Sequence, residues 1–97
     1  MFDTKFASFF DGCVAIYNAY MDETFALNTR DKFSFKRGGR YVKVIKGGGV
    51  HCFVDTTNGN VLKPASWRAP AKHARGNVFD ASNGLGSMGP YGPAYLR

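Results

Sequence analysis

The spacing of apolar residues changes once along this chain, at Asn28–Lys32, and the change limits the folds available to it. Before this polar break, apolar residues recur every three or four positions, as on one face of a helix. These positions are Phe6, Phe9, Phe10, Cys13, Tyr17 and Tyr20. After the break, apolar and polar residues alternate, as they do in half-buried strands. We therefore expect a core-packing helix over about residues 3–24 and strands within about residues 33–80.

Turn-forming residues divide the second region into about five short strands. The turn signals are Gly38-Gly39, Gly47–Gly49, Asn58-Gly59 and Arg75-Gly76, and Asn-Gly in particular is typical of tight hairpins. Pro64 ends a strand or confines it to a sheet edge. We expect irregular chain over residues 65–74 and a last short strand over 77–79. A helix followed by five short strands predicts a mostly β fold, a small and strongly bent barrel capped by its helix.

The size and composition fit one small folded domain. The chain has 97 residues, of which 44% are hydrophobic and 15% aromatic, and such values are typical of a globular protein. We expect the domain to cover residues 1–83, and residues 84–97 to be a Gly/Pro-rich tail that is ordered only against a neighbour. Oligomerisation is a common way to stabilise a domain of this size.

The residues needed for catalysis or metal binding do not occur in a usable pattern. His51 and Cys52 are adjacent on a predicted strand, so their side chains point to opposite faces. Cys13 and Cys52 lack the spacing of metal ligands and are expected to be reduced, buried thiols. We therefore predict a protein that is not an enzyme, with no cofactor and no metal. With no signal peptide and no apolar run long enough to cross a bilayer, a cytoplasmic protein without membrane contact is expected.

The charge distribution favours a nucleic-acid partner. The formal net charge is +6, and residues 60–76 contain four cations and no Asp or Glu. Cations bind phosphates, planar side chains stack on bases, and amides bond base edges. The residues of these kinds are Lys63, Arg68, Lys72 and Arg75, with His73 at lower pH, Trp67, and Asn58, Asn60 and Asn77. The alternative is a solvated basic face, and Trp67 by itself is expected to pack in the core or against another subunit.

Two short segments resemble the sequence motifs of the Sm/LSm family. The first is similar in Gly49, Val50, Phe53, Asp55, Asn58 or Asn60, and Val61-Leu62. The second is similar in Ala74-Arg75-Gly76-Asn77-Val78. The resemblance implies a five-stranded, SH3-type Sm-like barrel that forms a ring and holds RNA bases at its pore.

The resemblance also implies which residues bind RNA. Carried over to this sequence, the pore residues are Asp55, Asn58, Asn60, Arg75, Gly76 and Asn77. Lys63, Lys72 and His73 join them from the basic segment as phosphate contacts. The predicted partners are single-stranded RNA and further copies of the chain, in a ring of about five to seven subunits.

A second resemblance concerns origin rather than activity. Lys63–Trp67 and Pro70–Asp80 are similar to segments of small uncharacterised proteins of marine viruses, of the cyanophage type. This resemblance implies the cytoplasm of an infected bacterial host, and an Sm-like RNA-binding protein in that setting is expected to act in viral or host RNA processing. Two other functions stay open: a small viral structural or host-interaction protein that does not bind nucleic acid, and binding of single-stranded DNA.

Overall fold

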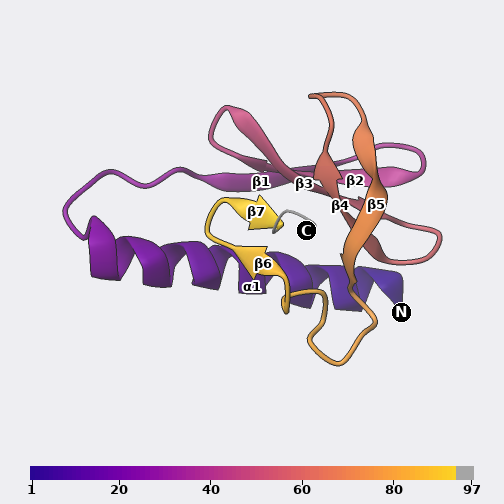
Figure 1. Cartoon of the computed structure of the whole chain (residues 1–97), viewed down its shortest axis with the longest axis horizontal. Helices are drawn as coiled ribbons and strands as arrows, with labels where there is room; N and C mark the ends of the chain where they lie inside the picture. Colours follow the sequence, from indigo (N-terminus) through magenta and orange to yellow (C-terminus); the bar gives the residue numbers. More distant parts are fainter. Residues whose placement is uncertain (94–97) are drawn as a thin grey trace.

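A computed structural model describes residues 1–93 and places one helix against one face of an antiparallel sheet (Figure 1). The helix, α1 (Phe2–Thr24), buries side chains that lie three or four residues apart. The buried residues are Phe6, Phe9, Cys13, Tyr17 and Met21. Residues at these spacings share one helix face, so the predicted N-terminal helix and its core-packing stripe are confirmed.

Five strands follow α1 and pair in the order of the sequence. They are β1 (Phe33–Arg37), β2 (Tyr41–Lys46), β3 (Gly49–Asp55), β4 (Asn60–Pro64) and β5 (Pro70–Asn77). All four pairings are antiparallel, which short hairpin turns allow. The predicted mostly β composition with five strands after the helix is confirmed.

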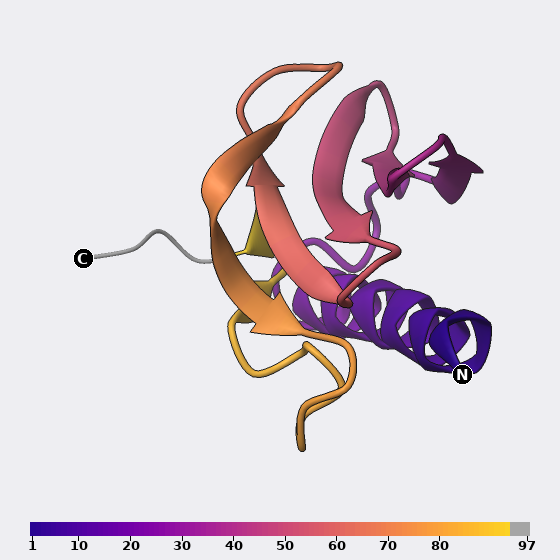
Figure 2. The same cartoon turned by 90° about the vertical axis from the view of Figure 1, so that its right-hand side faces the viewer.

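The sheet is strongly curved but open (Figure 2). In the described residues β1 and β5 form its two edges and do not pair with each other. A barrel closes only when its first and last strands are joined, so a single chain does not form the expected closed barrel. The outward N–H and C=O groups of both edge strands remain available for pairing with another chain.

The face of the sheet that packs on α1 is rich in valine. Its fully buried residues are Val42, Val44, Cys52, Val54 and Val61. In the register of β2 and β3, Val44 lies opposite Cys52 and Val42 opposite Val54. The alternating residues Tyr41, Lys43 and Phe53 therefore lie on the face turned away from the helix.

The last strand differs from the sequence prediction. Residues 65–74 were expected to be irregular and residues 77–79 to form the strand, but β5 begins at Pro70 and ends at Asn77. Residues 70–77 form a strand because they pair with β4, with Pro64 opposite Pro70 at one end and Asn60 opposite Asn77 at the other. The residues of β5 are small or polar, so a local hydrophobic pattern could not reveal a strand stabilised by its neighbour.

The chain after Asp80 folds back onto the domain instead of leaving it as a free tail. Leu85 and Met88 pack against the core, and β6 (Met88–Gly89) pairs with β7 (Gly92–Pro93) as a short ribbon beside α1 (Figure 1). Gly12, in the middle of α1, has no side chain and so leaves room for the Leu85 side chain. The order of residues 84–93 thus comes from the chain itself, and residues 94–97 of the predicted tail lie outside the described residues.

Two further expectations concern the cysteines and the membrane. Cys13 and Cys52 are both free and buried, as predicted, and burial raises the pKa of the Cys13 thiol to about 12. The thiol is therefore protonated at neutral pH. Across residues 1–93, no helix has the length and apolar character needed to cross a membrane.

The contact of Leu85 with the core predicts that the C-terminal segment contributes to stability. Leu85→Ala should lower the free energy of unfolding in urea by about 1–3 kcal/mol, because it removes partly buried methyl groups and leaves a cavity against α1. Leu27→Ala is the matched control, since the Leu27 side chain is fully exposed. Equal stability of the two variants would show that residues after Asp80 are not part of the folded unit.

Candidate nucleic-acid interface

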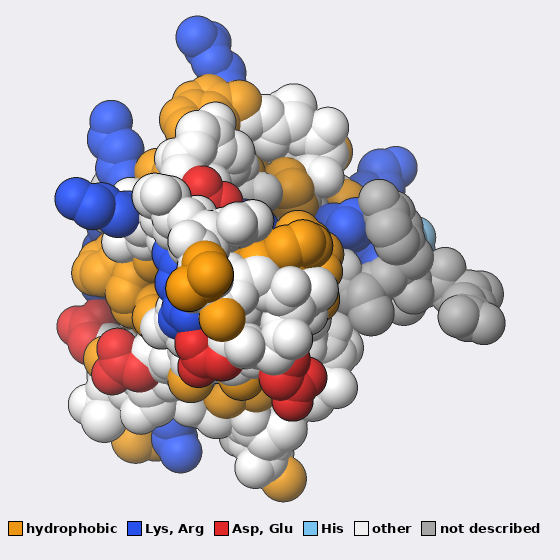
Figure 3. Space-filling model, turned by 90° about the vertical axis from the view of Figure 1, so that its left-hand side faces the viewer, with side chains coloured by type: hydrophobic (Ala, Val, Ile, Leu, Met, Phe, Trp, Pro, Cys, Tyr) orange, Lys and Arg blue, Asp and Glu red, His pale blue; other side chains and the backbone are white. Residues whose placement is uncertain are grey.

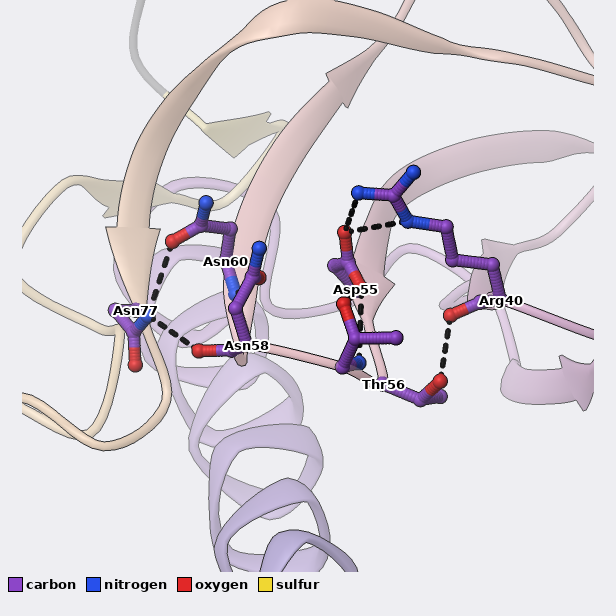
Figure 4. A network of polar contacts seen from close by, with 7 residues as sticks. Arg40, Asp55, Thr56, Asn58, Asn60 and Asn77 are labelled. Carbon is purple, nitrogen blue, oxygen red and sulfur yellow. Dashed lines mark hydrogen bonds and ion pairs between the residues drawn. The ribbon is translucent and has the colours of Figure 1, made fainter.

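Three asparagines converge where the β3–β4 turn meets the end of β5 (Figure 4). The Asn77 Nδ2 group donates to the backbone oxygen of Asn58 at 2.8 Å and to Asn60 Oδ1 at 2.9 Å. Asn58 Oδ1 accepts from the Asn60 backbone N–H at 2.8 Å, which fixes the turn. These bonds use the side-chain oxygens of Asn58 and Asn60. Within the described residues the two Nδ2 groups make no hydrogen bond, so they are donors available to a ligand.

Gly59 lets the turn approach β5 this closely. Its φ of +81° lies in the left-handed region, which favours glycine. A Cβ at this position would lie 2.6 Å from the Phe79 ring and 3.0 Å from Asn77 Oδ1. The Asn58-Gly59 pair, read from the sequence as a turn, therefore also sets the contact between the three asparagines.

Asp55 lies at the same end of the sheet, but its carboxylate is already hydrogen-bonded within the protein. Its side chain is buried, Oδ1 accepts from Thr57, and Oδ2 accepts from Arg40 Nε at 2.9 Å (Figure 4). Burial alone would raise the pKa of Asp55, but the hydrogen bonds from Thr57 and Arg40 outweigh it and the pKa is lowered. The same pairing raises the pKa of Arg40. Asp55 thus orients Arg40 and the turn, and direct contact with a base would require this pairing to break.

Arg75 and Gly76 lie just before Asn77, at an irregularity of β5. Gly76 pairs with Val61 and Ala74 pairs with Leu62, so Arg75 is an extra residue between two ladder positions. Such a bulge turns a side chain away from the regular alternation. The Arg75 backbone oxygen accepts from Ser87 Oγ, and the side chain is half-buried. The structure therefore places Arg75 next to the asparagine cluster in sequence and gives it a bulged conformation.

The other three predicted contacts do not join this cluster. Lys63 is half-buried and donates to the Pro93 backbone oxygen at 3.4 Å. Lys72 and His73 are exposed on β5, roughly 13–17 Å along the strand from Asn77 at ~3.3 Å per residue. Lys72 and His73 are placed to contact a strand running along β5, whereas Lys63 supports the C-terminal segment.

Charge is strongly divided between the sheet and the rest of the chain. Residues 33–77 hold nine of the thirteen Lys and Arg residues and only one of the seven Asp and Glu residues, Asp55. At the C-terminal end of α1, by contrast, acidic side chains gather beside basic ones (Figure 3). The sheet with its turns therefore carries the positive charge that a polyanion would meet.

Comparison with known proteins places the chain in a family. Residues 11–88 match the Family of unknown function (DUF7717). The chain belongs to this family. The matched segment contains all five strands and every residue of the asparagine cluster. No curated protein and no solved structure shows a significant match.

A second group of cations in this DUF7717 chain contains Arg68, named above, and three that sequence reasoning missed: Lys36, Arg40 and Lys43. Lys36, Arg40, Lys43 and Arg68 border a pocket on the sheet face turned away from α1. The first three lie in β1, in β2 and in the connection between them. The alternation of apolar and polar residues there is typical of any half-buried strand, so it did not indicate a binding site. The net charge of the two strands taken together would have indicated the site, because β1 and β2 are paired and contain Lys and Arg but no acid.

Trp67 was expected to pack in the core or against another subunit, and the structure excludes the core. Its side chain is 51% exposed, in the turn between β4 and β5. The Lys43 ammonium lies 4.2 Å from the centre of its ring, a cation–π contact. Trp67 therefore belongs to the same cationic face and is accessible to a ligand.

His51 has no role in this interface. The ring is buried, packs edge-on against Phe33 at 5.1 Å, and has no hydrogen-bond partner at either nitrogen in the described residues. Burial, and then the charges of Lys46 and Lys63, lower its pKa to about 4. No group of three or more His, Cys, Asp or Glu side chains that could hold a metal occurs within residues 1–93.

The buried neutral His51 predicts a loss of stability in mild acid. The unfolded ring takes up a proton near its ordinary pKa of 6.5, whereas the folded ring resists protonation until about pH 4. The free energy of unfolding should therefore fall by roughly 3 kcal/mol as the pH drops from 7 to 4. His51→Leu should remove most of this slope in urea unfolding.

His73→Gln is the control, because His73 is exposed and should leave the slope unchanged. The pKa values of Asp55 and Asp80 are lowered in the fold, so these carboxylates add a loss of stability only as the pH falls below about 5, and the slope between pH 7 and 5 is that of His51. A His51→Leu variant that keeps the full wild-type slope would contradict the assignment.

Proposed function

We propose that this chain is a non-catalytic, Sm-like protein that binds single-stranded RNA and assembles into a homo-oligomeric ring of about five to seven subunits. The observation that carries the proposal is the concentration of positive charge on residues 33–77, where Asp55 is the only acid. Binding a phosphate backbone to such a surface releases counterions and is favoured at low salt.

The asparagine cluster supplies polar groups that charge alone does not provide. The Nδ2 groups of Asn58 and Asn60 are donors at an exposed turn, and base carbonyl oxygens are suitable acceptors. Arg75, two residues before Asn77, adds a planar cation that can stack on a base or bond to it. In this proposal the amides read the base, Arg75 holds it, and Lys72 and His73 contact the phosphates.

The two open sheet edges support assembly. Edge strands β1 and β5 carry unpaired backbone groups in the described residues, and pairing them between copies would remove both edges. The curved sheet would then be closed by a neighbouring subunit. A ring repeats one weak base site several times, so a single strand that contacts several subunits is bound with avidity.

We propose that the protein acts in viral or host RNA processing, in the cytoplasm of an infected bacterial host. The resemblance to small marine viral proteins supports the setting. Two buried, free cysteines are compatible with a reducing compartment.

The viral structural or host-interaction alternative needs a different test after the fold is known. A deletion of residues 84–97 does not test it cleanly, because Leu85 and Met88 pack on the domain's own core. That deletion would therefore affect folding as well as assembly. Absence of salt-dependent RNA binding separates the alternatives more clearly.

The proposal predicts that Arg75→Ala weakens binding to oligo-U and oligo-A. We expect a loss of several-fold in fluorescence anisotropy titrations, with a salt dependence reduced by about one phosphate contact. The Lys5→Ala variant is the control, since it removes one charge from α1, away from the sheet. Thermal unfolding of both variants establishes that they are folded.

Solution mass tests the ring. A closed oligomer whose mass increases with RNA agrees with the proposal, and a monomer that ignores RNA at low salt contradicts it. Equal affinity of Arg75→Ala and wild type would exclude Arg75 from the base site. A parallel titration with oligo-dT decides between RNA and single-stranded DNA, because only RNA offers 2′-hydroxyl groups.

A further inference from the structure

A pocket of about 320 Å³ opens on the sheet face that α1 does not cover. It lies between the β1–β2 hairpin and the turn that joins β4 to β5. Its wall contains four cations and two aromatic rings, from Lys36, Arg40, Tyr41, Lys43, Phe53 and Arg68. The volume is at the lower end of the range of small-molecule sites, so the pocket admits one small planar group with its substituents.

Of the four cations of this pocket, only Arg40 is paired with an acid in the described residues. Lys36 and Lys43 are direct partners in the β1–β2 register, and like charges at such positions are destabilising. Asp55 is the only acid of residues 33–77, and its carboxylate is already hydrogen-bonded by Thr57 and Arg40. An anion bound between the two lysines would relieve their repulsion.

The aromatic side chains give the pocket a second chemical character. The rings of Tyr41 and Phe53 pack edge-to-face with their centres 6.2 Å apart. Trp67, half exposed beside them, holds the Lys43 ammonium over its ring. Gly38 and Gly39 form one rim of the pocket. The Tyr41 ring is half-buried, whereas the Phe53 ring beside it is only 2% exposed. Cations beside accessible rings are the combination that binds single-stranded nucleic acid by phosphate contact and base stacking.

We propose that this pocket binds one nucleoside phosphate unit, its phosphate between Lys36, Lys43 and Arg68 and its base against Tyr41 and Trp67. The unit is either a free nucleotide or one nucleotide of a single strand, since both offer the same groups. The site does not include the asparagine cluster or Arg75 and does not require a ring. It is a second nucleic-acid contact on each subunit, beyond the proposed pore.

Trp67 is the single tryptophan of the chain and lies against Lys43 of the pocket wall, so its intrinsic fluorescence reports on a ligand bound there. We expect saturable quenching on titration with an oligo-U of about ten nucleotides at low salt, and weaker saturable quenching with UMP. Quenching by UMP identifies a site that takes the free nucleotide. Quenching by the oligonucleotide alone identifies a site that needs the strand. Inorganic phosphate should bind at least about tenfold more weakly than UMP, because it cannot stack.

The double variant Lys36→Ala/Lys43→Ala tests the phosphate contact. We expect oligo-U affinity to fall about tenfold or more and the salt dependence to decrease by about two phosphate contacts. Its thermal stability should equal or exceed that of wild type, because the like-charge pair is removed. The matched control is Lys5→Ala/Lys32→Ala, which makes the same charge change on α1 and just before β1 and should retain wild-type quenching.

The outcomes separate this site from the proposed pore. Wild-type quenching in Lys36→Ala/Lys43→Ala, or equal affinity for UMP and inorganic phosphate, would overturn the pocket whatever Arg75→Ala does. Loss of quenching in the lysine variant with full quenching in Arg75→Ala supports the pocket even if the pore site fails. Binding of heparin with the same quenching as oligo-U would also overturn it, since heparin has charge but no base to stack.

Discussion

The packing of the aromatic face of α1 on the valine face of the sheet is the contact on which the rest of the structure depends. Phe9 is fully buried there, among Val44, Val54 and Val61, and each large apolar side chain buried in this way contributes about 1.5–3 kcal/mol. A single helix covers only one face of the sheet, and residues 81–93 close the margin of that layer. In the described residues no helix covers the opposite face, where Phe53 and Asp55 are buried but Lys43 stays partly exposed. The cations on this face are therefore accessible to a ligand.

This division into a packed face and a free face explains the distribution of charge. Lys43 alternates with the buried Val42 and Val44 on β2, so the period of two that buries the valines also places the cation on the face turned away from the helix. The turns at the sheet ends, which the core does not constrain, carry the asparagines. The cationic pocket and the asparagine cluster thus have the same origin. Both lie where the strands and turns are not needed to form the core against α1.

The helix, the strands β1–β4 and the Asn58-Gly59 turn could be predicted from the sequence because each has a local pattern of spacing or turn chemistry. Asn58, Asn60 and Asn77 were named from the sequence as amides near turns and from the Sm/LSm resemblance, whereas their convergence is seen only in the structure. Strand β5, the bulge at Arg75 and the packing of Leu85 could not be predicted locally. Each depends on a partner distant in the sequence: β4 for the strand and bulge, and Gly12 for Leu85. The pocket was missed for the same reason, because Lys36 and Lys43 become neighbours only through strand pairing.

Asp55 connects the two candidate surfaces. The family resemblance implies that it contacts RNA, but its buried carboxylate binds Arg40 on one side and the Thr57 turn on the other. The Arg40 backbone oxygen also accepts from Thr56, so the pocket wall and the asparagine turn are held in one hydrogen-bonded unit. A carboxylate facing RNA would repel phosphates, whereas a carboxylate neutralised by Arg40 organises the cations and amides that attract them. The one acid of the sheet is thus compatible with an anionic partner because it is buried and paired.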